Sequence, residues 1–275
     1  MLGDIYNKEE IIIGKAAGVF LKDYKIKEEL VDGLILAIEK LKDEYVDTLI
    51  LDDLLLLNKG DIEKIKNNTQ LMVVDGIKVL VFFLPFVLKS IYQGLKEDLK
   101  EKEVLIIGDE EEVTKELIEA LSQEVRFITL VGDYENSIDN IYEYILEKTG
   151  LSIFYSKRID RILTNYSVII NLKDKYSLNM NRIRKEALIF DFSMEKGLAN
   201  IKDRPNRLTV IEDFIFSIDQ LDIKANPFIS PLIPSYLYEY FYPYRYGDLV
   251  GLLIHGMVYT IEDFIDHKII NKGKL

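Results

Sequence analysis

The sequence predicts an α/β fold built on a parallel β-sheet that is buried on both faces. Apolar runs of strand length recur between residues 103 and 192, and segments with helical periodicity separate most of them. Strands that alternate with helices are typical of βαβ units, whose strands lie parallel. The runs are almost wholly apolar, as is typical of strands covered on both faces. A length of 275 residues favours two domains over one.

Residues 1–98 are expected to form a smaller N-terminal α/β domain. An amphipathic helix is predicted over Lys27–Lys42, where apolar residues recur at three- and four-residue intervals. Asp61 is expected to cap a second helix that runs through Lys66. The region also holds two short apolar runs of strand length, Thr48–Leu51 and Leu71–Val74.

The domain with the parallel sheet is expected to occupy residues 99–225. Its strands are predicted at five apolar runs, which are Val104–Ile107, Phe127–Val131, Ser152–Tyr155, Val168–Asn171 and Ala187–Phe190. Helices are predicted between them at Val113–Leu121 and at Ile138–Lys148.

Residues 226–275 are expected to form an aromatic segment followed by a C-terminal helix. The segment between Tyr236 and Tyr246 is rich in tyrosine, which joins a large apolar ring to a polar tip and is enriched at interfaces. It is therefore expected to form either a homodimer surface or the wall of a pocket between domains. The helix is predicted from about Leu249 to His267 and is expected to pack back on the N-terminal domain.

Composition excludes several classes of function. The formal net charge of −12 argues against a nucleic-acid-binding protein, because that affinity depends on Lys and Arg. Cysteine is absent and only two histidines occur, so disulfides, zinc sites and cysteine nucleophiles are excluded, and no metal site is predicted.

No membrane association is predicted. The most apolar segment, Val79–Leu88, is too short to span a bilayer and contains Pro85. The chain begins without a basic segment and an apolar stretch, so no signal peptide is predicted and the protein is expected in the cytoplasm.

The segment Gly108–Val113 follows the first strand of the predicted sheet. A dinucleotide-binding Rossmann fold carries G-x-G-x-x-G here, so that the backbone can approach the pyrophosphate. Only Gly108 is kept, and the side chain of Glu110 is expected to occupy the pyrophosphate's approach. A carboxylate about 6 Å from a phosphate charge costs roughly 0.7 kcal/mol at ε near 80 and about 2.8 kcal/mol at ε near 20. Four consecutive acids at 109–112 therefore disfavour phosphate, although they stabilise a helix N-terminus.

The order of these elements resembles the cofactor domain of the shikimate dehydrogenase and glutamyl-tRNA reductase group. The matching segments are Val104–Gly108, Val168–Asn171 after Arg161-Ile162-Leu163, and Ala187–Ser193. The resemblance implies a Rossmann-like domain and NAD or NADP as cofactor. It implies no activity, because the chain lacks the reductases' cysteine and residues 1–98 lack the dehydrogenases' Asn-Val-Thr-x-Pro-x-Lys motif.

Residues after the predicted strands are candidates for the cofactor site, because ligands of open α/β sheets bind outside the carboxyl ends of the strands. The candidates are Gly108, Asp133, Asn171, Asp191 and Ser193. Asp133 lies where an acid contacts the ribose, but it could equally cap the helix that follows. Lys173 and Lys196 could supply the positive charge that the segment Gly108–Val113 lacks, or they could be solvated loop residues.

Proton-transfer residues are scarce. His255 and Tyr259 would share one face of the predicted final helix, and Lys173 is a further catalytic candidate, although a histidine in so apolar a stretch is typically a packing residue. Two hypotheses follow. The first is an oxidoreductase that binds NAD(P) in an altered manner. The second is a non-catalytic binding or regulatory protein that keeps the Rossmann scaffold and has lost the cofactor. The partner expected of the protein is a small molecule or nucleotide.

Overall fold

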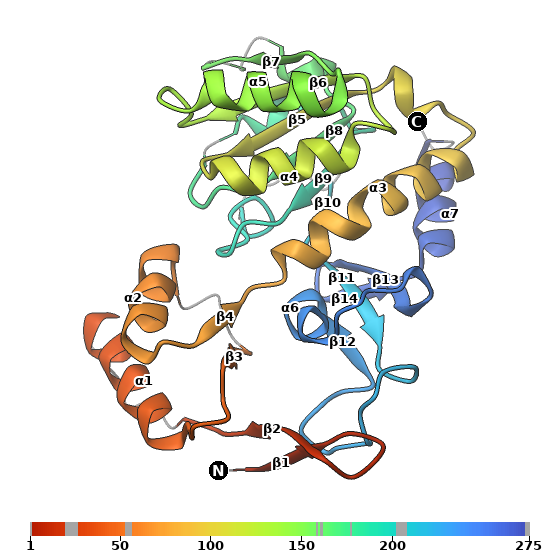
Figure 1. Ribbon diagram of the computed structural model, residues 1–275. Helices are drawn as coiled ribbons and strands as arrows, with labels where there is room; N and C mark the ends of the chain where they lie inside the picture. Colours follow the sequence, from red (N-terminus) through yellow and green to blue (C-terminus); the bar gives the residue numbers. More distant parts are fainter. Residues whose placement is uncertain are drawn as a thin grey trace.

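The computed structural model describes residues 2–19, 27–52, 57–157, 159, 162–176, 178–201 and 208–272 (Figure 1). Arg161, which belongs to one of the segments that carry the resemblance, lies outside the described residues.

The central sheet contains six parallel strands in the order β10-β9-β8-β5-β6-β7. They are β5 (Glu103–Gly108), β6 (Phe127–Gly132), β7 (Ile153–Tyr155), β8 (Val168–Asn171), β9 (Leu188–Asp191) and β10 (Thr209–Ile211). Counted along the chain this order is 3-2-1-4-5-6, that of a doubly wound Rossmann sheet. The predicted fold class and all five predicted strands are confirmed. The sixth strand, β10, was not predicted.

The two faces of the central sheet are covered differently. One face packs against α3 (Ile77–Gly94), α4 (Glu111–Leu121) and α5 (Ile138–Thr149), which form one large core with it (Figure 1). The other face lies under loops and two single-turn helices, η3 (Leu163–Asn165) and η4 (Met180–Arg182). Alternate residues of β5 divide between these two cores, with Ile106 in the first and Ile107 in the second. Both faces are therefore buried, as predicted.

A second, antiparallel sheet has the order β12-β11-β13-β14. Its strands are β11 (Asp213–Ser217), β12 (Leu232–Pro234), β13 (Leu249–Ile254) and β14 (Met257–Tyr259). The short helix α6 (Ser235–Tyr238) follows β12, and three single-turn helices, η2 (Leu99–Glu101), η5 (Glu239–Phe241) and η6 (Tyr246–Asp248), lie in connecting segments. Strand β11 falls within the expected range of the central domain, but it pairs with this sheet.

The predicted final helix from Leu249 is wrong. Residues 249–259 form the hairpin β13–β14, and the helix α7 begins only at Ile261 and ends at Lys272. The turn contains His255 and Gly256, whose φ angles are 52° and 72°. Positive φ at both central residues is the requirement of a tight hairpin turn. A short apolar run cannot distinguish strand from helix by periodicity alone, which explains the error.

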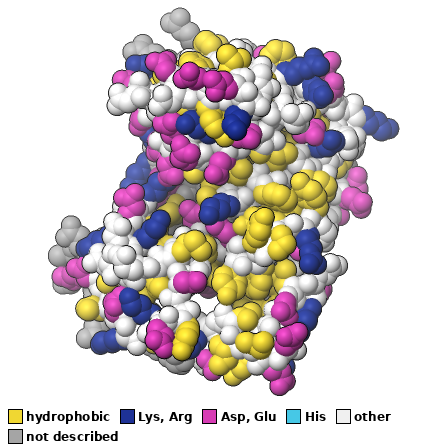
Figure 2. Space-filling view, in the orientation of Figure 1, with side chains coloured by type: hydrophobic (Ala, Val, Ile, Leu, Met, Phe, Trp, Pro, Cys, Tyr) yellow, Lys and Arg dark blue, Asp and Glu magenta, His cyan; other side chains and the backbone are white. Residues whose placement is uncertain are grey.

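Helix α3 joins the two sheets. Its buried residues belong to the same core as residues of the central sheet, of β11 and of β13. By length and composition alone α3 could cross a membrane, and it is longer than the predicted segment Val79–Leu88. Half of its most apolar stretch is buried inside the molecule, which is the position of a core helix. Figure 2 shows further apolar side chains exposed over the region of α3 and the antiparallel sheet.

Helix α7 packs on α3, as expected of a C-terminal helix that returns to the first part of the chain. A Cβ atom on Gly94 of α3 would lie 2.4 Å from Cδ1 of Ile265, so the two helices are in close contact there. Before α3, the described residues form an antiparallel hairpin, a parallel pair of strands and two helices. These are β1 (Gly3–Tyr6), β2 (Ile12–Ala16), α1 (Lys27–Leu41), β3 (Thr48–Ile50), α2 (Lys59–Thr69) and β4 (Met72–Val74).

Helix α2 begins at Lys59, three residues before the start expected with Asp61 as its cap. Its cap is Asn58, whose side chain accepts a hydrogen bond from the backbone N–H of Asp61 at 3.0 Å. The Asp61 carboxylate accepts in return from the backbone N–H of Asn58 at 2.9 Å. The pair forms a capping box, so Asp61 is the third helical residue and not the cap. This geometry places Lys59 at the start of α2, beside the central sheet.

Candidate functional site

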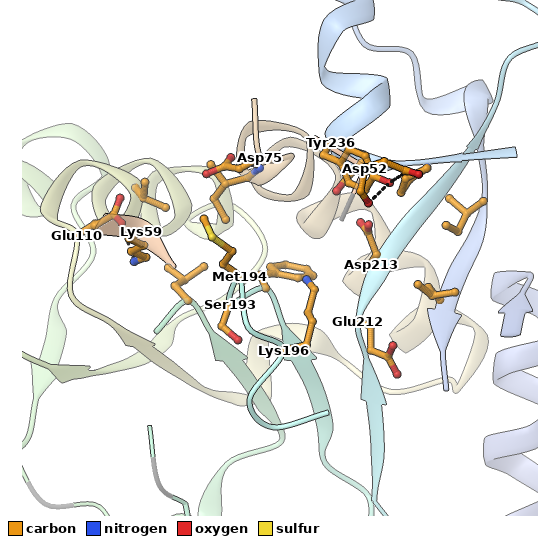
Figure 3. Close-up of a pocket in the computed structure, with 18 of the residues that line it drawn as sticks. Asp52, Lys59, Asp75, Glu110, Ser193, Met194, Lys196, Glu212, Asp213 and Tyr236 are labelled. Atoms are coloured by element: carbon orange, nitrogen blue, oxygen red, sulfur yellow. Dashed lines mark hydrogen bonds and ion pairs between the residues drawn. The ribbon is translucent and has the colours of Figure 1, made fainter. Parts of the chain in front are cut away.

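A cavity of about 440 Å³ lies at the carboxyl ends of the central strands, between that sheet, the antiparallel sheet and the first part of the chain (Figure 3). The loops after β5, β8 and β9 supply one wall. Strands β11 and β13 and helix α6 supply another, and residues beside α2 and α3 close the rest. Its volume lies within the range of about 300–1,000 Å³ that small-molecule sites usually have.

The cavity carries a strong excess of negative charge. Six acidic residues and two lysines line it, namely Asp52, Asp75, Asp109, Glu110, Glu212, Asp213, Lys59 and Lys196. Most of the other lining residues are apolar, among them Val113, Leu172, Phe192, Met194, Ile215 and Leu253. The cavity therefore joins apolar walls to a set of carboxylates.

Lys59 neutralises part of the negative charge of the segment Gly108–Val113, called the phosphate loop below. Its ammonium nitrogen lies 3.0 Å from Oδ1 of Asp109 and 2.6 Å from Oε1 of Glu110. Burial alone would lower the pKa of Lys59, but its hydrogen bonds to Glu110 and Asp109 outweigh that effect and raise the pKa. The side chain of Glu110 was expected to occupy the pyrophosphate's approach, and its carboxylate is held by this lysine. Sequence reasoning missed Lys59, because α2 reaches the loop only in the folded chain.

The space beside Gly108 is filled by Tyr134. This tyrosine is fully buried, and its hydroxyl shares a hydrogen bond of 2.6 Å with Oγ1 of Thr114. A Cβ atom on Gly108 would lie only 2.2 Å from that hydroxyl oxygen. Gly132, with φ of 142°, brings its backbone against the carbonyl oxygen of Gly108. Both glycines therefore permit close internal packing.

Asp133 and Lys173 form an ion pair across the end of the sheet. Lys173 Nζ donates to a carboxylate oxygen of Asp133 and also lies 3.9 Å from Oδ2 of Asp109. Lys173 therefore supplies positive charge to the first loop, as the sequence indicated. The cap position of α5 is Ser137, and no side-chain hydrogen bond caps that helix. The capping alternative for Asp133 is therefore wrong, whereas contact with a ribose stays a prediction.

Asn171, Asp191 and Ser193 form one buried network. Oδ1 of Asp191 accepts hydrogen bonds from Asn171 Nδ2 at 2.8 Å and from Ser193 Oγ at 2.6 Å. Its Oδ2 accepts from the backbone N–H groups of Leu198 and Ala199 at 2.7 and 2.9 Å. Asp191 is fully buried, so its carboxylate shapes the loop after β9 and only Ser193 of the three lines the cavity.

Asp213 is a buried carboxyl group that the sequence did not single out. It begins β11, is 6% exposed and lines the cavity. Burial raises its pKa, while the charge of Lys196 and hydrogen bonds from Ser235 and the backbone of Phe214 act in the opposite direction. Lys196, which donates to the backbone carbonyl of Asp191 at 3.1 Å, exerts this charge from the loop after β9.

A second carboxyl group with a raised pKa lies just before α3. Asp75 is exposed as a residue, but the cavity walls crowd its carboxyl group, and this burial and the charge of Glu110 raise its pKa. The neighbouring Glu239 accepts a hydrogen bond from the N–H of Gly76 at 2.7 Å. Burial also raises the pKa of Glu239, and the charge of Asp75 adds to it. A Cβ atom on Gly76 would meet Ser235 Oγ at 2.3 Å, so only glycine fits beside α6.

His255 and Tyr259 are not brought into this site. His255 is exposed in the hairpin turn, and its backbone N–H donates to Oε1 of Glu212 at 2.8 Å. Tyr259 lies on β14 opposite Leu252. The predicted pairing of the two on a helix face is wrong because no helix forms there, and the expected packing role of His255 is wrong because the residue is exposed. Within the described ranges no cluster of His, Asp and Glu could hold a metal ion.

The strand order and the cavity at the carboxyl edge define a Rossmann-like α/β protein with a small-molecule-sized site. No protein-family model matches the sequence, and no curated protein matches it. Among solved structures it is similar to quinate dehydrogenase from Corynebacterium glutamicum in complex with NAD, with 12% identity over 63% of this chain and 66% of that chain and a TM-score of 0.32.

Two further solved structures are similar to a comparable degree. Shikimate 5-dehydrogenase from Listeria monocytogenes shares 13% identity over 62% of this chain and 66% of that chain, with a TM-score of 0.31. Dipicolinate synthase A chain from Bacillus subtilis shares 14% identity over 70% of this chain and 58% of that chain, with a TM-score of 0.34. The matched region spans less than two thirds of each of these proteins. Two of the three structures, quinate and shikimate dehydrogenase, are of the group that the sequence resembles.

The residues at the phosphate loop do not fit the pyrophosphate of a dinucleotide. Tyr134 fills the space beside the one remaining glycine, and Glu110 stands where the second glycine would allow the phosphate to approach. Lys59 and Lys173 are the lysines beside this loop, and both already form ion pairs with carboxylates of the protein. The usual cofactor contact at a helix N-terminus is therefore obstructed by the protein's own side chains.

Proposed function

We propose that this protein binds a small molecule in the cavity between its two sheets and does not hold a dinucleotide on its phosphate loop. One observation carries the proposal. Glu110, held by Lys59, stands where a glycine would let a pyrophosphate approach, while a cavity of about 440 Å³ stays open beside it. Ligands of doubly wound sheets bind at this edge, so the general position of the site is kept and the ligand is changed.

The second candidate function is an NAD(P)-dependent oxidoreductase with altered cofactor contacts. The 3-2-1-4-5-6 strand order and an acid directly after β6 favour it. Asp133 would have to exchange its ion pair with Lys173 for the ribose hydroxyls. Lys59 and Asp75, both in the cavity, would be the groups able to move a proton.

Cofactor titration distinguishes the two candidates. Isothermal titration calorimetry of the full chain with NADH and with NADPH is expected to show no binding up to millimolar concentration. Binding in the micromolar range would overturn the first proposal and support the oxidoreductase. Tyr134→Ala is the informative variant, since it opens the space beside Gly108. If the wild-type chain bound NADH and Tyr134→Ala bound it more tightly, the phosphate loop would be the site of contact.

A further inference from the structure

The charges around the cavity are not balanced by the described part of the chain. Of the two lysines of the lining, Lys59 is paired with Asp109 and Glu110, whereas Lys196 donates to a backbone carbonyl and its charge acts on Asp213. Among the described residues, no lysine, arginine or histidine forms an ion pair with the remaining four acids of the lining. These four are Asp52, Asp75, Glu212 and Asp213.

The four carboxylates have hydrogen-bond donors from the protein, but these donors are neutral. Tyr236 donates to Asp52 at 2.7 Å, and the backbone N–H of Ile77 donates to Asp75 at 3.0 Å. Glu212 and Asp213 likewise accept from backbone N–H groups, at 2.8 and 2.7 Å. Neutral donors satisfy part of each carboxylate without cancelling its charge. The compensation that exists acts at a distance, from Lys59 on Asp75 and from Lys196 on Asp213.

These acids come from different elements that converge on the cavity. Figure 3 shows Asp52, Asp75 and Tyr236 along one side and Ser193 and Lys196 along the other. Asp213 is only 6% exposed, so its carboxyl group has little access to bulk water. Burial raises the pKa of Asp75 and of Asp213 because it disfavours their ionised form, and a bound cation would favour that form.

The rest of the lining decides what kind of cation would fit. Apolar side chains from both sheets, such as Leu172, Phe192 and Ile215, cover much of the wall. A bare metal ion needs converging oxygen ligands, and the described residues hold no such cluster. An organic cation with an apolar body uses both features, because its charge meets the carboxylates while its body contacts the apolar wall.

We propose that the ligand of this cavity is a small organic cation, a primary amine carried on an apolar or aromatic body, bound between Asp75 and Asp213. This inference rests on the proposed function and names the class of its ligand. An anionic molecule of the same size would meet an excess of four carboxylates, and a neutral one would leave them uncompensated.

A matched series of three probes tests the charge of the ligand. Phenethylamine, 2-phenylethanol and 3-phenylpropanoate share an aromatic body and differ in charge. Titration calorimetry of the full chain near neutral pH is expected to show phenethylamine binding about tenfold or more tightly than 2-phenylethanol, since charge-assisted hydrogen bonds are worth roughly that factor. The carboxylate probe is expected not to bind. Equal affinities, preference for the carboxylate, or no binding of the amine would overturn the inference.

Variants test the position of the cation. Asp75→Asn and Asp213→Asn are each expected to weaken phenethylamine binding about tenfold while leaving the weak binding of 2-phenylethanol unchanged. Glu147→Gln, which removes an exposed acid of α5 remote from the lining, is the matched control and should change neither. Melting curves show which variants fold, and Asp75, an exposed residue, keeps the test available if Asp213→Asn does not fold. Unchanged amine affinity in folded Asp75→Asn would contradict the proposed position.

A cavity-filling variant separates this inference from the proposed function. Met194→Trp puts a larger side chain at a partly exposed loop position of the cavity lining. If Met194→Trp abolished binding of a neutral or anionic probe that the wild-type chain preferred, the cavity would be the site and only the cationic ligand class would fail. If NADH bound and all three probes did not, the proposed function would fail as well.

Discussion

Gly108 shows how a residue of a familiar motif can be kept for a different physical reason. In a dinucleotide-binding loop this glycine allows the tight turn after the first strand. Here its missing side chain makes room for the hydroxyl of Tyr134, which lies 2.2 Å from the position that a Cβ atom would take. The glycine was predictable from the sequence. Its partner was not, because Tyr134 reaches it from the end of the neighbouring strand.

Gly108→Ala is expected to lower the free energy of unfolding by about 1–3 kcal/mol, the usual cost of overpacking a core. Urea denaturation measures the loss. Gly247→Ala is the control, because a Cβ atom there would meet nothing within 4 Å, and its effect should stay within about 0.5 kcal/mol. Adding Tyr134→Phe to Gly108→Ala should recover part of the loss, since it removes the clashing oxygen. Strict additivity of the two changes would show that the contact is unimportant.

Asp213 makes stability depend on pH in a direction opposite to that of an ion-paired carboxylate. Burial raises its pKa above the ordinary value of 3.8, so the folded chain holds this proton to a higher pH than the unfolded chain does. The group therefore contributes most below pH 3.8, and that contribution is lost as the pH rises through its folded-state pKa. Asp213→Asn should accordingly gain stability relative to wild type as the pH rises.

Urea unfolding at a series of pH values from about 4 to 8 measures this effect. The difference in unfolding free energy between Asp213→Asn and the wild-type chain is expected to grow in favour of the variant with increasing pH. Glu147→Gln is the control variant, because Glu147 is exposed on α5 and lies outside the cavity lining. A difference for Asp213→Asn that shrank with increasing pH would show that its carboxylate is stabilised by a partner.

At the scale of the element, the start of α2 is a small motif with a large effect on the site. The reciprocal bonds of Asn58 and Asp61 fix the first turn, and that turn carries Lys59 to the phosphate loop. Asn58→Ala is expected to cost about 1 kcal/mol of stability, the usual value of a helix cap, as measured by urea denaturation. Asn67→Ala, in an exposed position of the same helix, should cost nothing comparable. Equal losses for both would argue against the capping box.

The elements that the sequence predicts well are those whose pattern is long or unambiguous. The apolar runs of β5, β6 and β8 are bounded by charged or turn residues, so their type and position follow from composition. Residues 249–259 are equally apolar, but they form an antiparallel hairpin whose turn has positive φ angles at His255 and Gly256. The weakest point of sequence reasoning was thus the distinction between a short strand and a helix.

The aromatic segment illustrates a prediction with two branches. Tyr236 lines the cavity, in line with the expected pocket wall, whereas Tyr238 is fully buried and stacks on Phe216 with ring centroids 4.0 Å apart. Tyr246 is half exposed and stacks on Phe82 at 5.2 Å. A homodimer surface formed by the exposed tyrosines stays a prediction, as does a cytoplasmic location.

At the scale of the whole molecule, the site is assembled from parts far apart in the sequence. Asp75 precedes the central sheet, Asp109 follows its first strand, and Asp213 begins the second sheet. The sequence predicts the edge of the sheet at which a ligand binds, because that follows from the topology. It does not predict which distant carboxylates converge there, because their proximity depends on how α3 and the antiparallel sheet pack on the central strands.

The position of α3 has a consequence for how the molecule unfolds. This helix precedes the central domain in the sequence, yet its buried side chains complete a core shared by both sheets. A fragment cut at residue 99 would expose the apolar face that α3 covers, so residues 99–225 should not fold in isolation. Chemical denaturation of the full chain followed by tyrosine fluorescence and by circular dichroism is expected to give coincident transitions. The cooperative unit of unfolding would then include α3 together with the central domain, although α3 lies outside residues 99–225.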